Sequence, residues 1–365
     1  MAFTEKFVSA AAGGGGTGNS AGDPYTWAEM ITHSGSNTGH RYNILKGTYS
    51  LSSTDTLGSG TAAAPNEFSG YGTSEQDQDT LRDDPCAAAL DVSNFPVIDY
   101  SGGGGTLTGG GNIIVRNLHV KNDNNGTVFA CGTNNAVMHC KIENTHASGS
   151  SVVACQIGTS GSLVLDCDLV IASTANGAVA LNADRGSVGS SRLSGTGIGG
   201  IGVQCGGWTT VTRCALIGFF RAIECNSTYT FVYGCSFRNF TGSAVYHSAG
   251  LLGFVGNVVY STQTGSNLVN IGGAVRAHFQ INNARSTAGS DANEGDWPVQ
   301  GEVTLTADPF TSSSDLTLNA TAGGGAACKD VALGPNLDAG AAQSAGAGGG
   351  GGLLVPLGMA GGMAG

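Results

Sequence analysis

A short pattern that returns every 21 to 27 residues constrains this chain more than any other feature of its sequence. Each copy consists of an apolar residue, two variable residues, and then Cys, Asn, Ser or His. The eight copies end at Asn117, Cys140, Cys167, Ser191, Cys214, Cys235, Asn257 and His278. A second column with a similar spacing lies earlier in most copies, at Cys131, Cys155, Asn182, Cys205, Cys225, His247 and Asn270. Two columns that advance together indicate a solenoid, in which each copy forms one coil.

The apolar residues inside each copy alternate, which is the period of a β-strand rather than of a helix. Ile201, Val203 and Cys205 share one parity, for example. Gly, Ser, Thr and Asn gather between the copies, as at residues 124–126 and 241–243, and these residue types are typical of bends. We therefore predict an all-β solenoid built from short strands.

The copies resemble the right-handed parallel β-helix of the pectin-lyase-like superfamily, whose coils have about this length and carry Asn and Cys ladders at their bends. Residues 24–31 resemble the capping helix of that superfamily, and residues 308–318 resemble the closing segment of its bacterial and bacteriophage members. The resemblance implies a lead-in and cap over residues 1–40, a β-helix over 41–306, a closing segment over 307–338 and a Gly-rich arm over 339–365. The superfamily holds lyases, hydrolases, adhesins and inert spikes, so the resemblance does not by itself specify a function.

Composition narrows the classes of partner. The formal net charge is −11, and no basic stripe is present, which argues against nucleic acid and against anionic membranes. No apolar run approaches the length of a membrane span, so membrane insertion is not expected. The first eight residues also lack the basic start and apolar core of a secretory signal.

Eight of the ten cysteines fall in the two columns, which favours buried, reduced thiols that fill tight bends. Disulfides between stacked coils are the alternative. The sequence has no Cys-x-x-Cys, and the acidic insertion at residues 74–88 lacks the spacing of a calcium loop. We predict no metal and no cofactor, and a solvated loop for the insertion.

Asp166 and Asp168 are the first candidates for chemistry, because strand parity would place them on one face about 7 Å apart. Arg213 and His139 could complete a polysaccharide-hydrolase site. The alternative is a structural ladder, since Lys141, Asp168 and Arg192 alternate in charge on adjacent coils. We favour the ladder and assign no catalytic residue. A second charged patch, expected to be solvated, comprises Asp184, Arg185, Arg221, Glu224 and Arg238.

The leading functional hypothesis is a non-catalytic structural protein of a bacteriophage virion: a capsid decoration protein, a tail fibre or a short spike. The fold is typical of proteins that work outside cells, whereas reduced cysteines and a missing signal favour folding in the host cytoplasm. One alternative is a polysaccharide-degrading enzyme, such as a phage depolymerase, lyase or glycosidase. The other is an adhesin-like β-helix on a bacterial surface or outside the cell.

The C-terminal arm bears on the expected partners. Residues 339–365 consist mostly of Ala and Gly, yet the arm carries Leu353, Leu354, Val355, Leu357 and Met359. These apolar side chains would be a liability in water, so we expect the arm to dock on another subunit. The expected partners are further copies of this chain, with a trimer favoured by resemblance, and other virion proteins, with host-surface polysaccharide as a further candidate.

Overall fold

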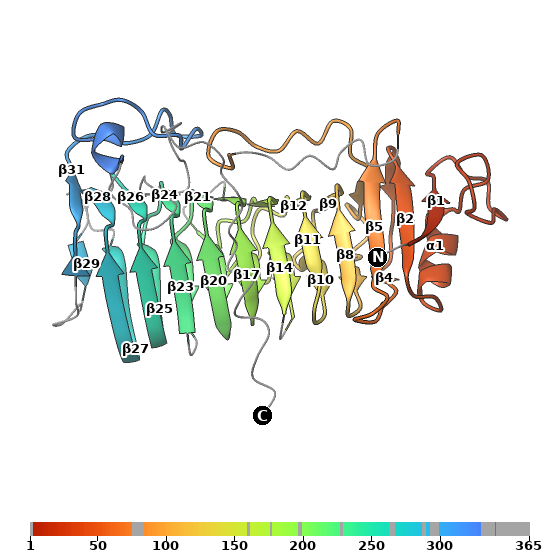
Figure 1. Ribbon diagram of the computed structural model, residues 1–365, viewed down its shortest axis with the longest axis horizontal. Helices are drawn as coiled ribbons and strands as arrows, with labels where there is room; N and C mark the ends of the chain where they lie inside the picture. The colour runs from red at the N-terminus through yellow and green to blue at the C-terminus, as the bar shows by residue number, and fades with distance from the viewer. Residues whose placement is uncertain are drawn as a thin grey trace.

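The chain forms a parallel β-helix (Figure 1). The computed structural model describes residues 3–74, 84–158, 161–175, 177–195, 199–226, 229–262, 267–286, 290–292, 299–329 and 340. Every pairing between named strands is parallel, and each strand pairs with strands of the neighbouring coils (for example β12 with β9 and β15). The strands belong to a 20-stranded sheet and an 11-stranded sheet.

The 20-stranded sheet contains two rows of strands. The first row is β4 (Asp55–Leu57), β7 (Leu107–Gly109), β10 (Thr127–Cys131), β13 (Val153–Ile157), β16 (Val179–Ala183), β19 (Ile201–Cys205), β22 (Arg221–Cys225), the first halves of β25 (Ser243–Val255) and β27 (Asn267–Ile281), and β29 (Ser290–Ala292). The second row is β1 (Thr4–Val8), β2 (His40–Leu45), β5 (Asn66–Tyr71), β8 (Ile113–Arg116), β11 (Ala136–Met138), β14 (Ser162–Leu165), β17 (Gly186–Gly189), β20 (Trp208–Thr212), β23 (Tyr229–Tyr233), the second halves of β25 and β27, and β30 (Val299–Gln300).

The 11-stranded sheet is the third row. It consists of β3 (Thr48–Ser50), β6 (Val97–Asp99), β9 (His119–Asn122), β12 (Lys141–Asn144), β15 (Asp168–Ile171), β18 (Arg192–Gly195), β21 (Ala215–Ile217), β24 (Ser236–Arg238), β26 (Val258–Tyr260), β28 (Ala284–Ser286) and β31 (Val303–Leu305). Two short helices complete the named elements, α1 (Trp27–Ser34) and the 3-10 helix η1 (Gly325–Cys328). No described helix is long and apolar enough to span a bilayer.

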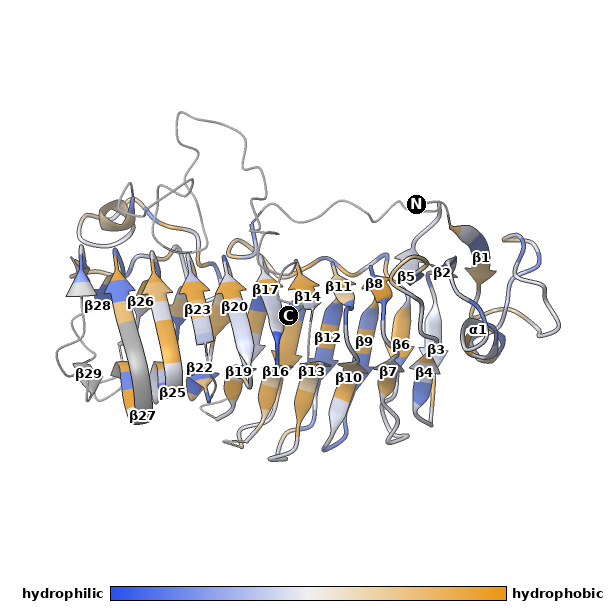
Figure 2. Cartoon of the chain, turned by 60° about the horizontal axis from the view of Figure 1, so that its bottom comes forward, coloured by the Kyte–Doolittle hydropathy of each residue, from blue (hydrophilic) through white to orange (hydrophobic). Residues whose placement is uncertain are grey.

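The core forms because the same kind of side chain returns to the same place in each coil. Val137, Val164, Val188, Val211 and Val232 stack in register along the second row, and all are fully buried. Apolar and polar residues consequently form bands that cross neighbouring strands (Figure 2). This stacking confirms the predicted parallel β-solenoid.

The first sequence column lies at the bend between the second and third rows. Its members Asn117, Cys140, Cys167, Ser191, Cys214, Cys235 and Asn257 are buried. The Sγ of Cys167 donates to the carbonyl of Val137 (3.5 Å), and Nδ2 of Asn257 donates to the carbonyl of Val232 (3.2 Å). Cys and Asn therefore interchange at this bend because both can donate to a carbonyl of the preceding coil.

The last member of this column is Asn283, not His278. Val258 pairs with Ala284, which places Asn283 next to Asn257, whereas His278 pairs with Leu252 inside β27. The Nδ2 of Asn283 also donates to the carbonyl of Phe254 (2.9 Å). The sequence pattern placed this member five residues too early. Strand β27 is long, and an apolar residue inside it, followed by two other residues and then His278, imitates the pattern.

The second column is less regular than the sequence suggested. Cys131, Cys205 and Cys225 occupy one register, but Cys155 lies two residues before it and pairs with Phe129 and Leu181. Asn182 has the opposite parity, pairs with Gln156 and Gln204, and faces outward. Its assignment to the inner ladder was wrong, since a shift of one residue exchanges the two faces of a strand. All ten cysteines are buried and unbridged.

The N-terminal end combines β1 and α1. Thr26 caps α1 through a capping box with Glu29, and Trp27 and Met30 are buried. Because β1 pairs in parallel with β2, strand pairing already begins within the segment predicted as a lead-in.

Two segments cover the outer face of the third row: the strap (residues 84–91) and the described part of the closing segment (residues 307–329) (Figure 1). Cys86 of the strap and Phe310 and Leu316 of the closing segment pack against Ile217 and Val258. Within the described part of the acidic insertion, Pro85 and Cys86 are buried, whereas Ser74, Ala87 and Ala88 are exposed, so the predicted solvated loop is packed down at residues 85–86. Residues 75–83, and the arm apart from Gly340, lie outside the described residues.

Candidate functional site

The bend before the first column brings two of the predicted catalytic residues together. His139 and Asp166 both have positive φ, 51° and 52°, and their side chains meet with Nδ1 2.6 Å from Oδ2. Asp166 is 1% exposed and His139 is 8% exposed. Asp166 lies in the bend between β14 and β15, whereas Asp168 is the first residue of β15, so strand parity does not relate the two side chains as the sequence analysis assumed.

Asp168 is held by the strap. It is 2% exposed, and its Oδ2 accepts a hydrogen bond from the backbone N–H of Leu90 (2.6 Å). Arg192, its neighbour in register, donates to the carbonyls of Pro85 (3.4 Å), Cys86 (3.3 Å) and Ser314 (2.5 Å). These contacts give both charged side chains a structural role, because buried charges need partners of this kind.

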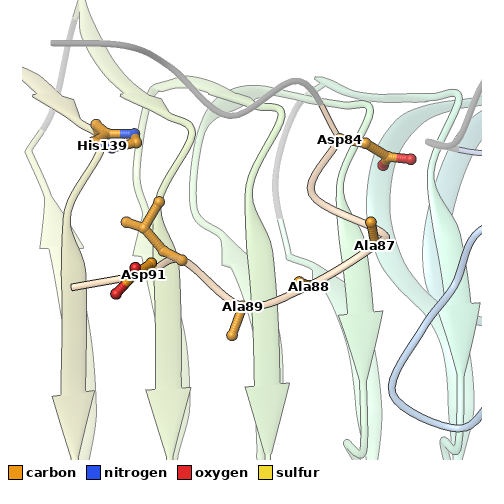
Figure 3. A pocket seen from close by; sticks show the side chains of 7 residues that line it. Asp84, Ala87, Ala88, Ala89, Asp91 and His139 are labelled. Carbon is orange, nitrogen blue, oxygen red and sulfur yellow. The ribbon is translucent and has the colours of Figure 1, made fainter. Parts of the chain in front are cut away.

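An open pocket of about 420 Å³ lies beside this bend (Figure 3). Its lining combines the strap with His139, and its floor is formed largely by Ala87, Ala88 and Ala89. Burial raises the pKa of Asp84 at its rim, while the Cys86 amide and the Arg213 guanidinium oppose that shift. Three of its seven lining residues are alanines, and His139 is already paired with Asp166, so we do not place the chemistry there.

A different cluster lies on the outer face of the first row. The Nη1 of Arg221 donates to Oε2 of Glu224 (2.6 Å), and the Arg221 guanidinium stacks 3.9 Å above the ring of Tyr246. Tyr246 is the register partner of Glu224 on β25. We call Arg221, Glu224 and Tyr246 the first-row cluster.

Neighbouring side-chain amides donate further hydrogen bonds to Glu224. Its Oε1 accepts from Nδ2 of Asn226 (2.7 Å) and Nε2 of Gln204 (3.5 Å). The carboxylate is largely buried, with its side chain 10% exposed, whereas the side chain of Arg221 is 29% exposed. Glu224 therefore orients Arg221, and the guanidinium remains accessible to a ligand from solvent.

The structure divides the second charged patch that the sequence suggested. Arg221 and Glu224 belong to the first-row cluster, but Arg238 lies on β24 of the third row and pairs with Asp308 at 2.5 Å. Asp184 and Arg185 lie beside the turn at Gly206 and Gly207, where a Cβ on either glycine would collide with them. Within the described ranges, no group of His, Cys, Asp and Glu side chains is arranged to hold a metal ion.

Sequence reasoning missed an aromatic row on the second strand row. Trp208, Tyr229 and Phe231 are 56%, 40% and 38% exposed, respectively. Their parity, opposite to that of the buried Val211 and Val232, could have identified them as outward-facing.

Comparison with known proteins identifies the fold. No family model matches the chain, and no curated protein matches it. Among solved structures, pectate lyase Pel9A is similar with a TM-score of 0.62 at 11% identity, covering 94% of this chain and 97% of that one. A rhamnogalacturonan lyase is similar with a TM-score of 0.51 at 12% identity, covering 85% and 91%.

An alginate lyase from Paenibacillus sp. str. FPU-7 gives a TM-score of only 0.32 at 13% identity, covering 75% and 95%, and supports no argument. None of the three structures is named as a phage protein, and the predicted tail-spike relationship stays a prediction. The chain has a right-handed parallel β-helix fold similar to that of pectate lyase Pel9A.

Proposed function

We propose that this protein binds and cleaves a polysaccharide on the outer face of the first strand row. The observation that carries the proposal is the first-row cluster, in which a guanidinium, an ionisable phenol and an orienting carboxylate meet on one accessible face. Two similar folds with TM-scores above 0.5 are titled as polysaccharide lyases, which supports this function over an inert spike.

Elimination is the reaction that suits these groups. Only one nitrogen of Arg221 is used by a hydrogen bond to the described residues, so the guanidinium can also pair with the carboxylate of a uronate. The Arg221 guanidinium then stabilises the negative charge that develops on the uronate carboxylate when the proton on the adjacent carbon is removed. Tyr246 acts in its phenolate form: its oxygen accepts that proton, and the resulting phenol then gives the proton to the departing glycosidic oxygen. The C–O bond breaks, a C=C bond forms, and a new reducing end is released.

Hydrolysis fits the cluster less well. A glycosidase of the common kind needs two carboxyl groups, one of which donates a proton. Both carboxylate oxygens of Glu224 already accept hydrogen bonds, one from Arg221 and the other from Asn226 and Gln204. The cluster therefore provides an oriented cation rather than a carboxylic acid.

The charges of the cluster and of the whole chain also narrow the class of polysaccharide that can be the substrate. Arg221 and Glu224 form a neutral pair, and the whole chain carries a net charge of −11. A dense polyanion would be repelled, whereas one isolated uronate could be held locally by Arg221. We propose a heteropolysaccharide in which uronates are separated by uncharged sugars.

The test incubates the protein with pectate, rhamnogalacturonan, alginate and acidic bacterial heteropolysaccharides. Unsaturated products are followed by ultraviolet absorbance, and reducing ends are counted separately. We expect unsaturated products from at least one heteropolysaccharide and a loss of about 100-fold or more in kcat for Tyr246→Phe.

Arg221→Lys should lower the rate as well, because lysine lacks the planar fork. Arg285→Lys is the matched control, since Arg285 is also ion-paired (2.5 Å to Glu302) and similarly exposed (31%) but lies on the third row. A fully active Tyr246→Phe variant, or reducing ends without unsaturated products, would contradict the elimination.

A role on a phage particle is a compatible proposal. A phage protein that degrades the surface polysaccharide of its host would combine this site with the predicted assembly through residues 339–365. Trimeric association and the virion location are motivated by the sequence alone and need separate tests.

A further inference from the structure

The three most exposed large apolar side chains of the described chain are all aromatic and all lie on β20 and β23. Trp208 and Tyr229 are register partners, and their ring centroids are 4.4 Å apart. Phe231 stacks with Tyr233 at 6.3 Å and 16° between planes. We call Trp208, Tyr229, Phe231 and Tyr233 the aromatic platform.

Packing among the residues that the structure describes does not account for the platform. Val211 and Val232, at the alternate positions of the same strands, already fill the core. Leaving indole and phenyl rings in water is unfavourable, and exposed apolar patches commonly mark binding surfaces. The platform therefore has the character of a recognition surface.

The polar surroundings of the platform indicate the kind of ligand. The outward positions of β20 and β23 carry the four rings together with Thr210 and Thr212, those of β17 carry Ser187 and Gly189, and none of these positions is charged. The Ser187 and Thr210 hydroxyls lie 3.1 Å apart, and Thr212 shares their face. A flat apolar ligand with hydroxyl groups at its rim matches this surface, and a pyranose ring has that form: C–H groups on its face and hydroxyls around its edge.

We infer that the aromatic platform is a sugar-binding subsite, distinct from the first-row cluster, that stacks on uncharged sugar rings of a polysaccharide. This inference rests on the proposed function, which it deepens by naming the part of the substrate that lies outside the reacting centre. The two sites are close along the chain: Gln204, which contacts the cluster, precedes Trp208 by four positions, and Glu224 precedes Tyr229 by five.

Two other occupants fit less well. Single-stranded nucleic acid also stacks on aromatic rings, but it requires cations along its backbone, and the platform strands carry none at their outward positions. A second copy of this chain would need a complementary surface, and self-association is therefore one outcome of the test below.

The experiment measures binding without cleavage. Affinity electrophoresis and isothermal titration with galactomannan, xyloglucan and mixed-linkage β-glucan, none of which carries a uronate, report on the platform alone. We expect binding to at least one of them, with an affinity that does not change between low and high salt, because no ion pair contributes.

Trp208→Ala should weaken this binding about tenfold, whereas Trp208→Phe should retain most of it. Thr304→Ala is the control, since Thr304 is an exposed hydroxyl residue on β31 of the third row, outside the platform. Trp208→Ala should leave the unfolding midpoint unchanged and should not alter the turnover of short uronate oligosaccharides that occupy only the first-row cluster.

The inference is overturned if no uncharged polysaccharide binds, if Trp208→Ala binds as well as wild type, or if salt abolishes the binding. It is also overturned if sedimentation shows that Trp208→Ala dissociates an oligomer, because the platform is then a contact between copies. A protein that binds uncharged polysaccharide but yields no unsaturated product would contradict the proposed elimination and leave the platform intact.

Discussion

The outer faces of the second and third strand rows differ in which side chains are covered and which are exposed. On the third row, Asp168 and Arg192 would point to solvent, yet the strap and the closing segment bury them to 2% and 8% exposure. On the second row, the described residues leave Trp208 and its neighbours bare. Charged groups are thus enclosed and aromatic groups are exposed, the reverse of what residue type alone would suggest.

This contrast distinguishes side chains that stabilise the fold from side chains that are available to a ligand. A buried charge that is hydrogen-bonded to the backbone, as Arg192 is through donation to three carbonyls, holds segments of the chain together. An exposed aromatic ring contributes little to folding and remains available to a ligand. The residues that resemble a catalytic pair in the sequence belong to the first kind, and the platform belongs to the second.

The largest test of this contrast compares two arginines. Arg192→Met should cost about 3–5 kcal/mol in the free energy of unfolding, because the carbonyls of the strap and closing segment lose their charged donor. Arg221→Met should cost less than about 1 kcal/mol, since its ion pair is partly exposed. Chemical denaturation of the two variants provides the measurement. Equal losses would show that the strap is not held by Arg192.

A second test concerns Asp166. Asp166→Asn removes the charged partner of His139 inside the bend and should cost about 1–3 kcal/mol. It should not change the rate of polysaccharide cleavage, since 1% exposure keeps substrate away from this carboxylate. Stability and turnover are measured on the same preparation. Loss of turnover at wild-type stability would restore Asp166 as a catalytic candidate.

The smallest test examines the core that lies behind both faces. Burial, together with the nearby Cys140 thiol, raises the pKa of the Cys167 thiol well above its ordinary value of 9.0. The folded protein therefore keeps this proton, so the stabilisation is complete below about pH 9 and is lost as the pH rises and the unfolded thiol ionises.

Between pH 8 and pH 10, wild type should lose about 1.4 kcal/mol more than Cys167→Ala. Denaturation curves at the two pH values isolate this difference, because other ionisable groups are common to both proteins. Parallel losses would mean that the thiol titrates normally in the folded state.

Several features of the fold were predictable because they depend on local chemistry that repeats. Val137, Val164 and Val188 recur at positions that must point inward, and the column that includes Cys167 and Asn257 recurs where a side chain must donate to the previous coil. The exposure of Trp208 and Phe231 was also encoded in strand parity, although it was not recognised.

The candidate site was predicted less well, for two physical reasons. A left-handed residue at each bend, such as Asp166, interrupts the alternation from which side-chain direction is inferred. In the last long coil, β27 contains two apolar runs, so the pattern alone could not choose between His278 and Asn283.

The sequence by itself determined the coil, its period and its inward columns, because those depend on contacts between equivalent residues of adjacent coils. Only the tertiary structure decided which outward residues are covered. The strap reaches Asp168 from 78 residues away, and Ser314 reaches Arg192 from 122 residues away. Such contacts have no period, so nothing in the repeat reveals them, and they convert a row of apparent catalytic residues into part of the structure.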